Sequence, residues 1–130
     1  MFERFPELKV VSVEYEAAWA AALINELDRR YKLYIYGLKN PEWTPFKNGA
    51  LPSDFFARNV FLCFQEDDLA IRIRGEIGVD RLMWGSDYPH GSGTFPRSRE
   101  LIDVTLGNVS PDERDRLVCR NAADLFGFRL

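Results

Sequence analysis

Histidine is almost missing from this chain, since His90 is the single one among 130 residues. Hydrolytic metal sites usually take two or three histidine ligands, so this chain alone does not supply a complete metal site. Cysteine is also scarce, and Cys63 and Cys119 lie far apart, outside any CxxC or metal-ligand spacing. We therefore expect two reduced, partly buried thiols with no assigned role.

Long apolar runs and long basic runs are lacking as well. No apolar stretch approaches the roughly 20 residues of a membrane span, and the N-terminal residues do not resemble a secretion signal. The formal net charge of −3 is spread along the chain, with no Lys or Arg cluster suited to a phosphate backbone. We expect a cytoplasmic protein that binds neither membranes nor nucleic acid.

What the sequence does contain is an alternation of short apolar segments with amphipathic ones. Apolar segments rich in β-branched residues predict strands at residues 8–13, 59–64 and 81–85. Helical spacing and capping residues predict helices at residues 19–31, 53–56, 69–77, 97–106 and 111–127. The composition, 46% hydrophobic and 28% charged, and the length together predict one domain over residues 1–130.

Two of these segments make specific local predictions. Leu69, Ile73 and Ile77 lie four apart, which predicts one apolar helix face, and Gly78 is placed to end that helix. Residues 37–52 hold three prolines and two glycines without periodicity, which predicts an irregular excursion. Trp43 and Phe46 within it are placed to fold over another part of the molecule.

The predicted strands are apolar nearly throughout, which indicates burial on both faces. Such strands, alternating with helices, predict an α/β fold with a parallel sheet and right-handed crossovers. A complete (β/α)8 barrel takes about 250 residues. Three strand and helix units plus a C-terminal helix make about half of one, with at least one strand edge open.

Polar side chains follow each predicted strand. The loops after parallel strands gather at one face of the sheet, so Glu14, Gln65, Glu66 and Asp87 are expected to converge there. Carboxylates that meet above a buried sheet can bind a divalent metal or act as general bases. An acid after a strand can also cap the following helix, and capping is the favoured interpretation for Asp67 and Asp68. For Glu14, capping and a functional role both remain open.

Asp87 has the surroundings of a functional residue. Gly85 allows a close backbone approach, Pro89 stiffens the following loop, and His90 is near enough to face the same cavity. The alternative for His90 is a surface imidazole. The Gly91-Ser92-Gly93 loop lacks the lysine of a phosphate loop, and Ser86 lacks the frame of a nucleophile elbow.

The string LMWGSDYPH at residues 82–90 resembles the last barrel strand of the amidohydrolase-2 family of metal-dependent TIM-barrel proteins. Residues 5–14 are similar to the family's sixth strand, residues 52–60 to the approach to its seventh, and NAADLFG at residues 121–127 to its closing helix. The resemblance covers nearly the whole chain. It implies the C-terminal part of the barrel, with strands equivalent to the sixth to eighth.

The resemblance also implies a chemistry. Family members hydrolyse C–N or ester-type bonds, or decarboxylate small organic acids, with the help of a divalent metal such as zinc or manganese. By this match Asp87 is a general base and metal ligand, His90 lies near the substrate, and Glu14, Gln65 and Glu66 line the pocket. The metal-binding histidines of the earlier family strands have no counterpart here, so the isolated chain is expected to be inactive.

Two classes of function are therefore predicted. One is a portion of a metal-dependent hydrolase or decarboxylase acting on a small organic acid or amide. The other is a noncatalytic half-barrel that serves as an assembly or binding module. In either case we expect self-association, or a partner that supplies the missing strands, because the sheet edge is open.

Overall fold

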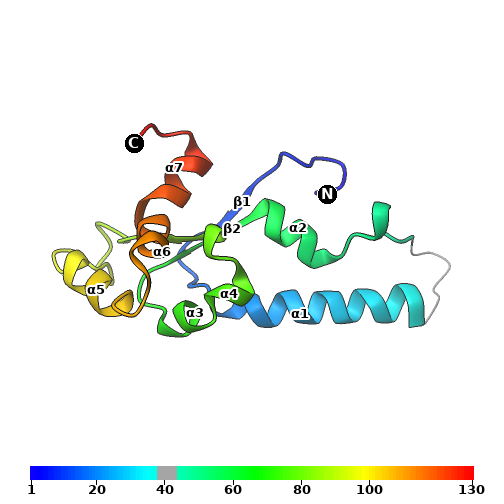
Figure 1. The fold of residues 1–130 in the computed structure, drawn as a ribbon, viewed down its shortest axis with the longest axis horizontal. Helices are drawn as coiled ribbons and strands as arrows, with labels where there is room; N and C mark the ends of the chain where they lie inside the picture. Colours follow the sequence, from blue (N-terminus) through cyan, green and yellow to red (C-terminus); the bar gives the residue numbers. More distant parts are fainter. Residues whose placement is uncertain (38–43) are drawn as a thin grey trace.

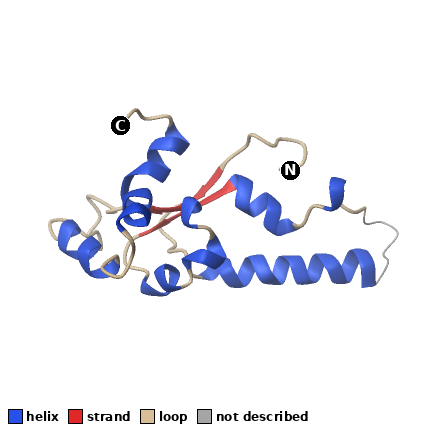
Figure 2. Ribbon diagram, in the orientation of Figure 1, coloured by secondary structure: helices blue, strands red, loops and turns tan. Residues whose placement is uncertain are grey.

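The computed structural model describes residues 1–37 and 44–130 of the chain. Its described residues form a three-stranded sheet in the order β1-β2-β3, from β1 (Val10–Ser12), β2 (Val60–Phe64) and β3 (Leu82–Trp84) (Figure 2). Both strand pairs are parallel, with Val10 beside Val60 and Leu62 beside Leu82. The predicted α/β fold with a parallel sheet is confirmed.

Helical segments connect the strands and pack around them (Figure 1). The long helix α1 leads away from the sheet. Helix α2 lies beside α1, and the chain then returns to the sheet as β2. None of the described helices is long and apolar enough to cross a membrane. The segments are α1 (Trp19–Lys32), η1 (Leu33–Gly37), η2 (Lys47–Gly49), α2 (Pro52–Asn59), α3 (Asp68–Arg72), α4 (Arg74–Ile77), η3 (Val79–Arg81), α5 (Ser98–Thr105), α6 (Pro111–Asp115), η4 (Arg116–Arg120) and α7 (Asn121–Phe126).

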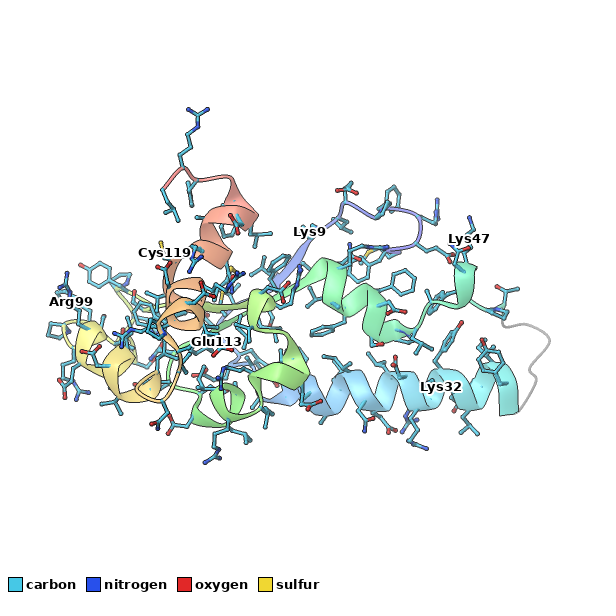
Figure 3. All side chains as sticks on the ribbon, viewed as in Figure 1. Lys9, Lys32, Lys47, Arg99, Glu113 and Cys119 are labelled. Carbon is cyan, nitrogen blue, oxygen red and sulfur yellow. The ribbon has the colours of Figure 1, made fainter. Side chains whose placement is uncertain are left out.

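The core forms where the helices meet β2 and β3. Leu62 on β2 and Leu82 on β3 are fully buried, and Leu106 and Leu117 are 1% exposed. Each buried leucine stabilises the fold by about 1.5–3 kcal/mol relative to exposure. Charged side chains such as Lys32, Lys47 and Arg99 are exposed at the periphery (Figure 3).

The predicted burial of all three strands is wrong for β1. Val10 is 40% exposed and Val13 just beyond the strand is 63% exposed. Both β1 and β3 are edge strands of the described sheet, but η4 and α7 pack on β3, whereas among the described elements β1 packs mainly against β2. An apolar sequence predicts a strand suited to burial, whereas burial itself requires other elements to pack on the faces of the strand.

The predicted helix of residues 69–77 is two short helices, α3 and α4. The backbone leaves helical geometry at Ile73, with φ −105° and ψ 17°, and Leu69 on the predicted apolar face is 48% exposed. Ala70 and Ile71 are buried, whereas Ile73 and Ile77 of the predicted face do pack on the core and Gly78 ends α4 as predicted. The Asp67 carboxylate holds the first turn of α3 against the start of α1, and this tertiary contact overrides the four-residue spacing.

Phe46 folds over the helices as predicted. Its ring stacks on Tyr31 with centroids 4.8 Å apart, its edge contacts Phe55, and its backbone N–H donates to the Tyr31 hydroxyl at 2.7 Å. The matching prediction for Trp43 lies outside the described residues.

Ser110 and Pro111 begin the last helical run as predicted, since the Ser110 hydroxyl accepts the backbone N–H of Glu113.

Candidate active site

A cavity of about 470 Å³ lies where the loops after the three strands meet, and we name it the strand-end pocket. Parallel strands place their carboxyl ends at one edge, which explains why residues from distant parts of the sequence share it. Glu66 is exposed and does not line this pocket. The lining residues are Val13, Glu14, Glu16, Cys63, Phe64, Gln65, Gly85, Asp87, His90 and Ser92.

Asp87 and His90 form a pair in the pocket. An Asp87 carboxylate oxygen, Oδ2, lies 2.8 Å from the imidazole Nδ1 of His90. The Asp87 side chain is 19% exposed and that of His90 is 69% exposed, so the carboxylate is the more enclosed partner. An ionised carboxylate only accepts hydrogen bonds, so this contact places a proton on Nδ1 and leaves Nε2 as the acceptor in neutral His90.

Three pocket residues have an unusual backbone. Glu14, Glu16 and Asp87 have φ values of 58°, 52° and 55°. These values lie in the left-handed region, which residues other than glycine rarely adopt. All three lie in the loops that follow β1 and β3, and all three line the pocket. Such local strain persists where surrounding contacts fix the chain, and it is typical of functional sites.

Gln65 links the first loop of the pocket to the third. Its backbone N–H donates to the Glu16 carboxylate at 3.0 Å, and its side-chain amide donates to the Ser92 carbonyl at 2.8 Å. The indole N–H of Trp84 donates to the Gln65 carbonyl at 3.2 Å. Sequence reasoning missed Glu16, although a second acid two residues after Glu14 was the available signal.

Asp67 is a structural residue next to the pocket. Its carboxylate accepts backbone N–H groups of Ala17 at 2.9 Å, Ala18 at 2.8 Å and Ala70 at 2.9 Å. Burial acts to raise the pKa of Asp67, but hydrogen bonds from these groups and Leu69 outweigh it and hold that pKa below its usual value. The predicted capping role is confirmed for Asp67.

Cys63 contributes a half-buried thiol to the pocket wall. Burial raises the pKa of this thiol, because the apolar surroundings disfavour the thiolate. A thiol that stays protonated is a poor nucleophile and a poor metal ligand. Cys119 is also a free thiol, and both cysteines agree with the expectation of reduced side chains.

The donor set does not fit a divalent metal by itself. Within residues 1–37 and 44–130, no group of three or more His, Cys, Asp and Glu side chains could hold a metal ion. Zinc sites take three or four protein ligands, and the Asp87 and His90 pair falls short of that number. Across the same ranges, the pocket lining has three carboxylates but neither Lys nor Arg.

The fold and the pocket define part of a TIM barrel, with a candidate active site at the carboxyl ends of its parallel strands. The family model described as amidohydrolase matches residues 1–128. The chain belongs to the amidohydrolase family. The resemblance inferred from the string at residues 82–90 is thereby confirmed.

Two solved structures share this fold. An amidohydrolase from Mycobacterium avium subsp. paratuberculosis K-10 is 28% identical with a TM-score of 0.75, over 97% of this chain and 30% of that one. The 5-carboxyvanillate decarboxylase LigW from Sphingomonas paucimobilis is 21% identical with a TM-score of 0.72, over 98% of this chain and 36% of that one. The chain thus spans about a third of each.

A curated relative is similar over a shorter region. The 4-sulfomuconolactone hydrolase of Rhizobium radiobacter is 45% identical over 58 residues, which is 40% of this chain and 19% of the relative. Similar proteins therefore include one named as a hydrolase and one named as a decarboxylase.

Proposed function

We propose that this chain supplies one face of the active site of a metal-dependent amidohydrolase-family enzyme, with Asp87 as the general base. The observation that carries the proposal is the pairing of Asp87 with His90 at 2.8 Å inside the strand-end pocket. The substrate is a small organic acid, ester or amide. The reaction is hydrolysis of a C–N or ester-type bond, or decarboxylation.

Asp87 moves a proton in both reactions. In hydrolysis the carboxylate accepts a proton from the attacking water and delivers it to the leaving group. In decarboxylation the carboxylate first takes up a proton from water and then passes it to the carbon that loses carbon dioxide, which regenerates the carboxylate. His90 donates from Nδ1 to the carboxylate and so orients it, while the opposite nitrogen accepts a hydrogen bond from substrate.

The metal belongs to the complete barrel in this proposal. Zinc or manganese is expected from the family, and Asp87 is the ligand that this chain would contribute. The described residues do not form a metal site, so the isolated chain is proposed to be inactive. Glu14 and Gln65 line the substrate side of the same pocket.

The test is the Asp87→Asn variant in the complete barrel, assayed against lactones and hydroxylated aromatic carboxylic acids. We expect at least a hundredfold loss of kcat, because removing a general base costs about 10²- to 10⁴-fold. Asp124→Asn, at an exposed carboxylate on α7, is the control and should retain full activity. An active Asp87→Asn enzyme would contradict the proposal.

A second candidate is a noncatalytic module that assembles through its sheet edge. The observation that favours it is the exposure of β1 and of the segment before it, since Val10 and Leu8 are each 40% exposed. An unpaired apolar edge strand is a template for pairing with another chain. Turnover of any assayed substrate that depends on Asp87 would decide against this candidate.

A further inference from the structure

The segment that carries Asp87 and His90 is closed by its own backbone. The Thr94 N–H donates to the Ser86 carbonyl at 2.9 Å, which joins the two ends of the segment. Inside it, the His90 N–H donates to the Asp87 carbonyl at 2.8 Å. We name residues 86–94 the Asp87 loop. Because its ends are tied together, its conformation fixes where both functional side chains lie.

Gly93 lies against the backbone of this loop. A Cβ atom at position 93 would lie 2.9 Å from the carbonyl oxygens of Ser86, Asp87 and His90. Real Cβ atoms essentially never approach other atoms so closely, and backbone carbonyls cannot turn away as a flexible side chain can. Any residue other than glycine would therefore push apart the three peptide groups that hold Asp87 and His90.

Gln65 ties the Asp87 loop to the neighbouring strand. Its side-chain amide donates to the Ser92 carbonyl at 2.8 Å, across 27 residues of sequence. The backbone of Gln65 is itself fixed, by the Glu16 carboxylate on one side and the Trp84 indole on the other. The Gln65 amide is thus a hydrogen-bond donor with a fixed backbone, and it binds the Asp87 loop at Ser92, two residues after His90.

We propose that Gln65 and Gly93 are positioning residues that hold Asp87 and His90 in contact. Gly93 permits the close packing of the Asp87 loop, and the Gln65 amide fastens that loop to β2. The catalytic meaning of this arrangement rests on the proposed function. The arrangement itself is tested without any substrate.

The test reads the tautomer of the imidazole by ¹H–¹⁵N correlation NMR at pH 8, where His90 gives the sole histidine signal of the full chain. In the wild type, the Asp87 carboxylate holds the proton on Nδ1. The Asp87→Ala variant gives the reference signature of an imidazole that has lost its carboxylate partner and keeps only the Ser92 hydroxyl, which lies 3.1 Å from Nδ1. In Gln65→Leu and Gly93→Ala, the imidazole signals are expected to move from their wild-type positions toward those of Asp87→Ala.

Each variant has a matched control. Gly91→Ala is the control for Gly93→Ala, because a Cβ at position 91 meets nothing within 4 Å. Glu66→Gln is the control for Gln65→Leu, because Glu66 is the exposed neighbour outside the pocket lining. Both controls should keep the wild-type signature. Gln65→Leu leaves the backbone hydrogen bonds of position 65 in place, so we expect it to fold. It therefore still tests the proposal if Gly93→Ala does not fold.

A wild-type signature in Gln65→Leu or in folded Gly93→Ala overturns the role of that residue. The NMR result tests the positioning roles independently of the proposed function. The proposed function fails only if Asp87→Asn retains activity. A shifted signature with an active Asp87→Asn enzyme would leave the positioning intact and reject the general base.

Discussion

Acidic residues after strands acquire their roles from what surrounds them. Asp67 and Asp87 both follow apolar strands in the sequence, but the local pattern predicts a helix cap for Asp67 and a functional residue for Asp87, which Pro89 and His90 follow. In the structure Asp67 accepts backbone N–H groups from the turn before α1 and from the first turn of α3, whereas Asp87 lies against an imidazole at the pocket. The first carboxylate is occupied by structural contacts, and the second is available for proton transfer in the proposed enzyme.

Replacing Asp67 should destabilise the fold. Asp67→Ala leaves the N–H groups of Ala17 and Ala70 without their acceptor at a buried site, and each such loss costs about 1–3 kcal/mol. We expect a drop of about 3 kcal/mol in the free energy of unfolding, measured by urea denaturation. Asp68→Ala, at the exposed next position, should change it by less than about 0.5 kcal/mol.

Acid should remove the Asp67 contribution. The pKa of this carboxyl is lower in the folded protein than in the unfolded chain, so the folded state binds its proton less readily. Its stabilisation is therefore complete above the unfolded pKa of about 3.9 and is lost as the pH falls through the folded value. The stability difference between wild type and Asp67→Ala should shrink below about pH 4. A constant difference down to pH 2 would contradict this assignment.

At the scale of elements, Asn121 explains the motif that begins the last helix. Its side-chain amide donates to the carbonyls of Val79 and Leu82, both at 2.8 Å, and the residue is 5% exposed. These bonds fasten α7 to the start of β3. The NAADLFG string therefore begins with a residue that packs the closing helix against the sheet.

Removing this amide should loosen α7. Asn121→Ala leaves two carbonyls without their donor and creates a small cavity, so we expect a loss of about 2 kcal/mol in the free energy of unfolding. Asn108→Ala, at an exposed asparagine, is the control and should be within about 0.5 kcal/mol of wild type. Equal stabilities of the two variants in thermal or urea unfolding would show that Asn121 does not anchor the helix.

At the scale of the whole molecule, the sheet ends at an exposed strand. β2 has a parallel neighbour on each side, whereas β1 has one neighbour among the described residues. The similar solved structures are about three times longer than this chain, since it covers 30% and 36% of them. In the proposed complete barrel, further strands would cover β1, because parallel sheets are typically buried on both faces.

We expect the isolated chain to associate through β1. Sedimentation velocity should show dimers or larger species whose proportion rises with protein concentration. Val10→Lys places a charge on the open strand and should shift the distribution toward the monomer. Val104→Lys, at a valine that is 73% exposed on α5, should not. A concentration-independent monomer in the wild type would contradict the open-edge topology.

The sequence by itself determined the order of the strands, their parallel sense and the convergence of Glu14, Gln65 and Asp87. These follow from local apolar patterns and from the geometry that gathers parallel strand ends at one edge. The tertiary structure decided that β1 is exposed, that the helix breaks at Ile73 and that Gln65 bridges two loops. The physical reason is that these outcomes depend on contacts between residues 27 to 50 positions apart, which no local pattern encodes.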